Sequence, residues 1–429
     1  MLTAPTAFSG NSSLVTRALI ILTSLNFLDY LDRYLVASLG SLIKAEMGLS
    51  DRAFGFLGTA FFLVYFLSSP VFGYLGDRFG RLRLMAAGAV LWSLATSLTY
   101  WVVSYPALVL ARGLVGVGEA SFGTVAPAYL ADTLPLSRRS RALGFFYLAL
   151  PVGSAAAYLV GGLVGSKWGW RPAFLLGGIP GMLLAALVLR LPSAPTLYQG
   201  LGVNSEKPAE KPGSLRHPPS LWIGARDLWR LPTLRRVTLG YGMITFTLGG
   251  LAFWMPRYLE AVKGLEMAQA NYLLFGAVTV AGGLGIMTGG FLGDRLLAYT
   301  LKAPLLVSGL GVALSIPLAA LAIFAQDPYF YVPGLAGAIF LLFLNPGVLT
   351  AVVVSVAGPG RRAQAVALNI VVIHLVGDVP SPVLIGWGAD LWGLKWGVSF
   401  TLLALVAGAA LIFWATSYLA RDLEAAGEI

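Results

Sequence analysis

The 429-residue sequence has no cysteine and only two histidines, His217 and His374. The missing cysteines exclude disulfide bonds, thiol catalysis and cysteine-based metal sites. With so few histidines, we expect no metal site and no metal cofactor. Charged residues are also scarce, at 11% of the chain, whereas a typical soluble domain has about 25%. The composition therefore argues against a soluble globular protein.

Two further absences narrow the function. No glycine-rich loop ends in Gly-Lys-Ser or Gly-Lys-Thr, so a P-loop ATPase is excluded. No His/Asp cluster resembles a nucleophile or metal constellation, so we do not expect an enzyme. A membrane-embedded lipid enzyme and a non-transporting receptor stay open as alternatives from other functional classes.

What the sequence has in abundance is apolar residues, which make up 57% of the chain. They form runs of 18 or more residues, long enough for transmembrane helices, whereas barrel strands would be about ten residues long and alternating. Twelve runs are found, with approximate limits 14–44, 53–76, 83–103, 106–131, 141–166, 172–192, 235–261, 268–293, 302–325, 329–357, 363–389 and 396–420. We predict an all-α polytopic membrane protein with twelve transmembrane helices.

One long polar segment separates the first six spans from the last six. We therefore predict an N-terminal six-helix bundle at 14–192, a cytoplasmic linker at 193–234 and a C-terminal six-helix bundle at 235–420. The linker ends in SLWIGARDLWRLP, which predicts an amphipathic helix at the membrane surface. Its apolar side would carry Leu221, Trp222, Ala225, Leu228 and Trp229.

An internal repeat supports this division. GYLGDR at 73–78 recurs as GFLGDR at 290–295. Six spans followed by six in the same orientation form a parallel repeat, and two such halves around a midplane site are a transporter design.

The basic residues predict the orientation. If both termini are cytoplasmic, 20 of the 29 Lys and Arg lie on the cytoplasmic side and 7 on the other. The positive-inside rule then places both termini in the cytoplasm of a plasma (inner) membrane. The net charge of +10 is accounted for by topology, so we expect membrane lipid around the chain and no nucleic-acid partner.

Span one carries four polar residues at membrane depth: Asn26, Asp29, Asp32 and Arg33. At 100° per residue they fall within about 120° of one another on the helix. Ionisable groups at this depth usually line a substrate or ion path. The alternative is a structural Asp29–Arg33 pair at i,i+4, which would leave Asp32 as a spare acid.

Span four aligns Arg112, Gly116, Glu119 and Gly123 on one stripe. Counted from the inner helix ends, Arg33 and Glu119 lie at similar depths, about 24 and 20 Å. A contact between them is therefore expected. A buried carboxylate can exchange a cation partner for a proton, and the alternative is a static buried ion pair.

Span eleven places His374 and Asp378 one turn apart, beside Gly377 and two prolines that interrupt the helix. Broken helices at membrane depth occur beside protein or a cavity. His374 is either a satisfied interior histidine or a gating or proton-transfer residue. With Asp378 one turn away, the two roles are about equally supported.

The loop after span two reads GYLGDRFGRLR and closely resembles the cytoplasmic signature of the major facilitator superfamily. The resemblance implies the major facilitator fold and a gating latch between the two halves in the outward-facing state, with Asp77 against the start of span eleven. The repeat copy has Leu297 and Ala298 where Gly80 and Arg81 stand, so no matching latch is expected there. The predicted latch residues are Gly73, Gly76, Asp77, Arg78, Gly80 and Arg81.

LNFLDYLDRY in span one and HLVGDVPSP in span eleven resemble the spinster branch of this superfamily, whose members transport sphingolipids and lysolipids. The resemblance implies proton coupling through Asp32, Arg33 and Glu119, and the span-four motif adds Arg112. Candidate substrate-binding residues are Arg33, Glu119, Asn26, Asp29, His374 and Asp378.

These observations predict a proton-coupled secondary active transporter of an amphipathic, lipid-like substrate. It would work by rocker-switch alternating access, as a monomer, with no cofactor apart from the coupling proton. The alternative within transport is a multidrug or small-metabolite carrier of the same superfamily.

Overall fold

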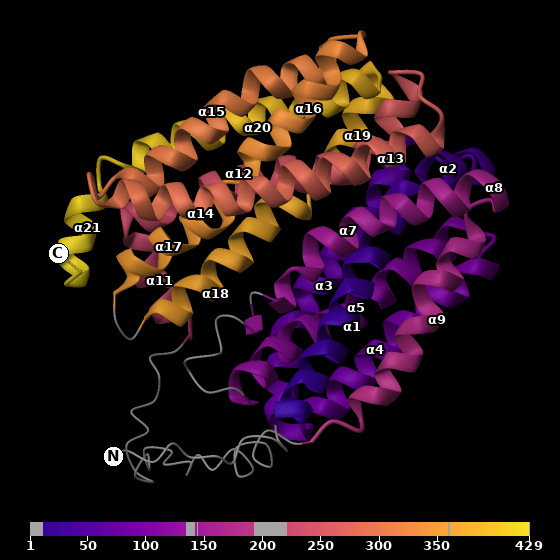
Figure 1. The fold of residues 1–429 in the computed structure, drawn as a ribbon, viewed down its shortest axis with the longest axis horizontal. Helices are drawn as coiled ribbons and strands as arrows, with labels where there is room; N and C mark the ends of the chain where they lie inside the picture. The colour runs from indigo at the N-terminus through magenta and orange to yellow at the C-terminus, as the bar shows by residue number, and fades with distance from the viewer. Residues whose placement is uncertain (1–11, 134–141, 144, 193–220, 359–360, 429) are drawn as a thin grey trace, which may run out of the picture. The chain divides into compact units, whose positions relative to one another are not determined.

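The computed structural model describes residues 12–133, 142–143, 145–192, 221–358 and 361–428. Within this part of the chain the regular structure is helical and contains no strand (Figure 1). Twelve helices among the described residues are long and apolar enough to cross a membrane. The predicted all-α fold with twelve spans is therefore confirmed.

The first six spans comprise the following helical segments, apart from the described helical residues at 142–143 and 145–147. They are α1 (Ser12–Ser38), α2 (Gly40–Met47), α3 (Asp51–Phe79), α4 (Arg81–Leu98), η1 (Thr99–Trp101), α5 (Tyr105–Thr133), α7 (Ala149–Val160), η2 (Gly161–Gly165), α8 (Ser166–Trp168) and α9 (Arg171–Val188).

The later part of the chain begins with a surface helix and continues through six spans to a short terminal helix. The segments are α11 (Leu221–Arg230), α12 (Pro232–Ala261), α13 (Met267–Ala277), η3 (Val278–Gly282), α14 (Gly283–Leu297), α15 (Ala303–Phe324), α16 (Pro328–Leu342), α17 (Asn345–Ala357), α18 (Arg362–Ile373), η4 (His374–Asp378), α19 (Ser381–Trp392), α20 (Leu394–Ala415) and α21 (Leu419–Ala426).

Contacts divide the chain into two compact units. The first is Met1–Leu35, Val64–Ala157 and Trp168–Leu215, and the second is Val36–Leu63, Tyr158–Lys167 and Arg216–Ile429. The second unit thus includes α2, the first half of α3 and η2 together with the later spans. The predicted domains follow the sequence repeat rather than these contacts, and they stay a prediction.

Close packing in the first unit depends on small residues where α4 meets α5. A Cβ added to Gly118 would lie 2.6 Å from the Gly88 oxygen and 2.7 Å from the Trp92 Cβ. Small residues let helix backbones approach closely where lipid offers no hydrophobic driving force. This contact fixes the part of α5 that carries Glu119, the next residue.

The second unit is organised around α12, which packs against α20 and η4, while α15 packs against α16 and α20 (Figure 1). At its start lies α11, where Leu228 is fully buried and Arg226, Asp227 and Arg230 are exposed. A helix with one buried and several exposed side chains is thus present at the end of the predicted linker, and its place at the membrane surface stays a prediction. The rest of the predicted linker, residues 193–220, lies outside the described residues.

Several spans depart from regular α-helix. Spans five, eight and eleven contain the π-helical segments η2, η3 and η4. In span ten, α16 ends at Leu342 and α17 begins at Asn345, whose side-chain amide donates to the carbonyls of Leu341 (3.2 Å) and Leu342 (2.9 Å). The predicted break in span eleven is therefore present, and span ten is interrupted as well.

Candidate functional site

Arg33 connects span one to span four inside the first unit. Its Nη2 lies 2.9 Å from Glu119 Oε2 and 3.2 Å from Asp29 Oδ1, and its Nε lies 3.2 Å from the same Glu119 oxygen. The expected Arg33–Glu119 contact is therefore present, and so is the i,i+4 pair with Asp29. One guanidinium is shared by two carboxyl groups.

Asp32 lies with a second basic residue. The Thr96 hydroxyl of α4 donates a hydrogen bond to it, and the opposite charges of Asp32 and Arg112 interact. Arg112 Nη2 also donates to the Arg33 carbonyl at 3.2 Å. Asp32, which the Asp29–Arg33 pair leaves without a partner, therefore lies in the same group of charged residues as Arg33 and Arg112.

We call these five residues the ion cluster: Asp29, Asp32, Arg33, Arg112 and Glu119. Four are buried, with Asp29 2%, Asp32 1%, Arg112 2% and Glu119 0% exposed, while Arg33 is partly buried, with its side chain 10% exposed. A buried charge without a partner is costly. With all members ionised, three acids and two bases leave one uncompensated negative charge, so the arrangement can accept one proton.

Two oxygen atoms show where a proton or ligand could bind. Asp32 Oδ1 and Glu119 Oε1 are buried and have no hydrogen-bond partner among the described residues. Native proteins usually satisfy such atoms, so an exception needs an explanation. A proton on either carboxyl group would convert one of these acceptors into a donor.

Aromatic rings surround the guanidinium. Arg33 Cζ lies 4.5 Å from the Tyr30 ring centre and 5.2 Å from that of Tyr65, distances at which cation–π attraction operates. A Cβ added to Gly123 would lie 2.5 Å from the Tyr65 hydroxyl oxygen, so the glycine of the span-four stripe makes room for this ring. The sequence analysis identified the glycine but missed Tyr30, Tyr65 and Thr96.

Asn26 is placed differently from its predicted role in substrate binding. Its side-chain amide donates to the Phe146 carbonyl at 2.9 Å and is 3% exposed. This bond connects span one to the start of span five. Its part in substrate binding stays a prediction.

His374 and Asp378 pair with each other in the second unit. They stand at the two ends of η4, and the His374 Nδ1 is hydrogen-bonded to Asp378 Oδ2. The side chain of His374 is 37% exposed and that of Asp378 is 10% exposed. Gly249 of α12 allows the carboxylate to approach, since a Cβ there would lie 2.2 Å from Asp378 Oδ1. Their roles stay a prediction.

The predicted latch falls where α3 ends and α4 begins. Gly73, Gly76, Asp77 and Arg78 belong to α3, Gly80 separates the helices with φ +90°, and Arg81 begins α4. A positive φ favours glycine, which accounts for Gly80. The Asp77 side chain is not among those the structure describes, so the latch itself stays a prediction.

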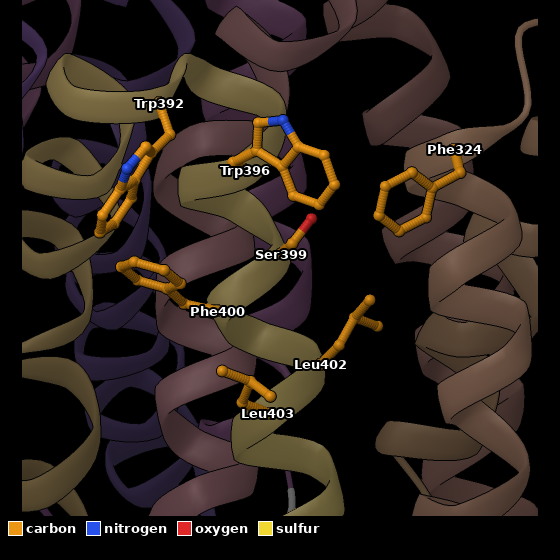
Figure 2. Close-up of a pocket in the computed structure, with 7 residues that line it drawn as sticks. All are labelled: Phe324, Trp392, Trp396, Ser399, Phe400, Leu402 and Leu403. Atoms are coloured by element: carbon orange, nitrogen blue, oxygen red, sulfur yellow. The ribbon is translucent and has the colours of Figure 1, made fainter.

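A cavity of about 540 Å³ lies in the second unit, and none of the predicted site residues lines it (Figure 2). It lies where α15 and α19 end and α20 begins. Four of the lining residues are aromatic, and aromatic residues are enriched at membrane–water interfaces. It is lined by Phe324, Trp392, Trp396, Ser399, Phe400, Leu402 and Leu403.

Known proteins resemble this chain over most of its length. The Major Facilitator Superfamily model matches residues 22–377. Protein spinster homolog 1 of Mus musculus is 33% identical over 415 residues, covering 91% of this chain and 75% of the relative. The chain belongs to the spinster branch of the major facilitator superfamily. This membership makes it a multi-pass membrane transporter and not an enzyme.

Two further relatives and one solved structure agree with this assignment. Protein spinster homolog 1 of Xenopus tropicalis is 36% identical, covering 86% of this chain and 72% of the relative. The sphingosine-1-phosphate transporter SPNS2 of Mus musculus is 33% identical, covering 86% and 69%. The fold is similar to the crystal structure of a bacterial spinster homologue in an inward-facing, occupied conformation, with a TM-score of 0.80, 20% identity and 97% and 99% coverage.

Proposed function

We propose that this spinster protein is a proton-coupled secondary active transporter of an anionic, lipid-like amphiphile that works by alternating access. The observation that carries the proposal is the ion cluster, in which one guanidinium is shared by two buried carboxyl groups. A transporter needs a group whose partner can change during the cycle. Arg33 suits this role because it already contacts two carboxyl groups and could exchange one of them for substrate.

The proton enters the proposal through charge balance. Three acids and two bases lie together, and binding one proton neutralises their excess negative charge. A proton on Glu119 would weaken its hold on Arg33, because a charged hydrogen bond contributes about 1.5–3 kcal/mol and a neutral one less. Arg33 would then be available to an anionic head group. Proton binding and substrate binding would thus be coupled through one side chain.

The substrate class rests on two supports. One relative is described as a sphingosine-1-phosphate transporter, a lipid with a phosphate head group. Arg33 is suited to such a group because its planar guanidinium can bind phosphate through two hydrogen bonds. The two tyrosine rings beside it offer an apolar edge to the adjoining chain.

Counterflow in proteoliposomes tests this substrate class. Vesicles containing the purified protein would be loaded with unlabelled lysophospholipid or sphingoid-base phosphate and diluted into a trace of the labelled compound. Transient accumulation of label, absent from empty vesicles, is the expected result. Ligand-induced thermal shift across lipids, cationic drugs and small metabolites separates the alternatives, and stabilisation by drugs or metabolites alone would contradict the lipid assignment.

We further propose that the protein resides in the plasma (inner) membrane with both termini in the cytoplasm and that it functions as a monomer. The support for the orientation is the basic-residue bias across the loops. Apart from the coupling proton, no cofactor enters this mechanism.

A further inference from the structure

The start of α3 depends on a residue from a distant helix to complete its hydrogen bonds. The first amides of an α-helix have no acceptor within the helix. Ser50 supplies its own cap here, with its hydroxyl accepting from the Ala53 amide at 3.1 Å. The amides of Asp51 and Arg52 need acceptors from elsewhere.

Asp390, in the last turn of α19, supplies both acceptors. Its Oδ1 accepts from the Asp51 amide at 2.7 Å and its Oδ2 accepts from the Arg52 amide at 2.9 Å. Each carboxylate oxygen therefore binds one amide. A negative charge is also favourable at a helix N-terminus, where the helix dipole is positive. The end of span eleven thus caps the start of span two.

Glycines let these two helices approach closely enough for the cap to form. A Cβ added to Gly386 would lie 2.4 Å from the Asp51 carbonyl oxygen, and one added to Gly55 would lie 2.2 Å from the Pro382 oxygen. Farther along the same contact, the Thr59 hydroxyl donates to the Val379 carbonyl at 2.7 Å. The cap therefore stands at the end of a continuous backbone-to-backbone contact.

The Asp51 side chain extends the contact to two more helices. Its carboxylate pairs with Lys44 of α2 and lies 3.1 Å from Arg257 Nε of α12. All of these residues belong to the second unit. Four helical segments, two from each half of the sequence repeat, are thus joined around the first turn of α3.

We propose that Asp390 is a gating residue, whose cap on α3 stabilises the state in which this end of the transporter is closed. The proposal rests on the alternating-access cycle proposed above, because opening this end requires spans two and eleven to separate. Separation leaves the Asp51 and Arg52 amides to water. Helix caps of this kind are worth a factor of about five to ten in an equilibrium, so Asp390 would set how often this end opens.

Pulsed electron–electron double resonance can measure this equilibrium directly. Spin labels can be attached at chosen positions because the chain has no native cysteine. Spin labels would be attached at Val103→Cys and Tyr329→Cys, which are 85% and 87% exposed and which the topology places at the same membrane side as Asp390. In lipid nanodiscs, Asp390→Ala should raise the ratio of long to short distances about five- to tenfold. Asp390→Asn, which keeps the shape and one acceptor, should give a smaller rise.

Glu266→Gln is the matched control. Glu266 also caps a helix at this side of the membrane, but that helix is α13, which begins at the next residue. Its loss should leave the distance distribution unchanged. An unchanged distribution in both Asp390 variants, or an equal change in Glu266→Gln, would overturn the proposal. The Asn variant serves if the Ala variant does not fold.

The distance measurement requires neither substrate nor a proton gradient. A lack of counterflow would therefore contradict the proposed substrate class but would not change the result expected for the spin-label distances. Conversely, unchanged distances would remove Asp390 from gating and leave the transport proposal in place.

Discussion

Arg33 contacts two carboxyl groups through two nitrogens of one guanidinium. Nε and Nη2 face Glu119, while Nη2 also faces Asp29. This arrangement depends on the planar fork of arginine, which lysine lacks. The Asp29–Arg33 pair and the Arg33–Glu119 pair are therefore one connected system rather than alternatives.

Arg33→Lys keeps the positive charge but should lower the counterflow rate at least about tenfold. A single ammonium nitrogen cannot reproduce the two-nitrogen contact of Nε and Nη2 with Glu119, and losing one hydrogen bond to a charged group costs about 1.5–3 kcal/mol. Initial rates in proteoliposomes measure the effect. Arg17→Lys, in the exposed first part of the same helix, is the control and should behave as wild type. Equal rates for the two variants would contradict a bidentate role for Arg33.

At the scale of the helices, close contacts through glycine fix the position of the ion cluster. Gly118 precedes Glu119 and lies against the backbone of α4. Any side chain there must push α4 and α5 apart or distort them. The packing of two helices and the position of the carboxylate are thus determined by the same residue.

Gly118→Ala should destabilise the protein by about 1–3 kcal/mol, the usual cost of overpacking. Thermal unfolding in detergent, followed by tryptophan fluorescence, measures the loss. Gly283→Ala is the control, because nothing lies within 4 Å of a Cβ built there. An equally stable Gly118→Ala protein would show that α4 and α5 can separate without cost.

The C-terminal helix provides another cap between distant elements. Asp422 of α21 accepts from the Thr233 amide at the start of α12, at 2.8 Å, and is 3% exposed. Beside it, the Arg236 guanidinium lies 4.0 Å from the Trp414 ring and 4.2 Å from the Tyr418 ring. The Asp422–Thr233 hydrogen bond therefore holds α21 against the start of α12, the helix that organises the second unit.

Asp422→Ala should lower stability by about 0.5–2 kcal/mol, as removal of a helix cap does. Glu424→Ala changes an exposed acid in the same short helix and should have little effect. Thermal unfolding midpoints of the two variants, measured in the same detergent, test this difference in stability. If they coincide, α21 does not stabilise α12.

The sequence predicted the elements well because membrane spans depend on length and apolarity, which can be read locally. Its limits appear inside the spans. The pairing of Asp29, Arg33 and Glu119 followed from helix periodicity and depth. Thr96, in contrast, is one of several hydroxyl residues in span three, near Ser93, Ser97 and Thr99, and nothing in the sequence distinguished it from them. Asp390 likewise gave no signal. It directly follows the predicted span at 363–389, and a cap between α19 and α3 depends on contacts across 338 or 339 residues of sequence.

At the scale of the whole molecule, we propose two cooperating features. In this proposal the ion cluster of the first unit provides proton-dependent binding, and the Asp390 cap of the second unit provides a gate. A secondary transporter needs both functions, because a proton gradient drives accumulation only if binding and opening alternate. The central claim is that Glu119 links the proton to Arg33.

Uptake of labelled lysophospholipid under an imposed pH gradient tests that claim most directly. Wild-type proteoliposomes should respond to the gradient, with a change in accumulation of up to about tenfold per pH unit for one coupled proton. Glu119→Gln vesicles should retain counterflow but give the same accumulation with and without the gradient. A wild-type protein indifferent to the gradient, or a Glu119→Gln protein that responds as wild type does, would contradict the account.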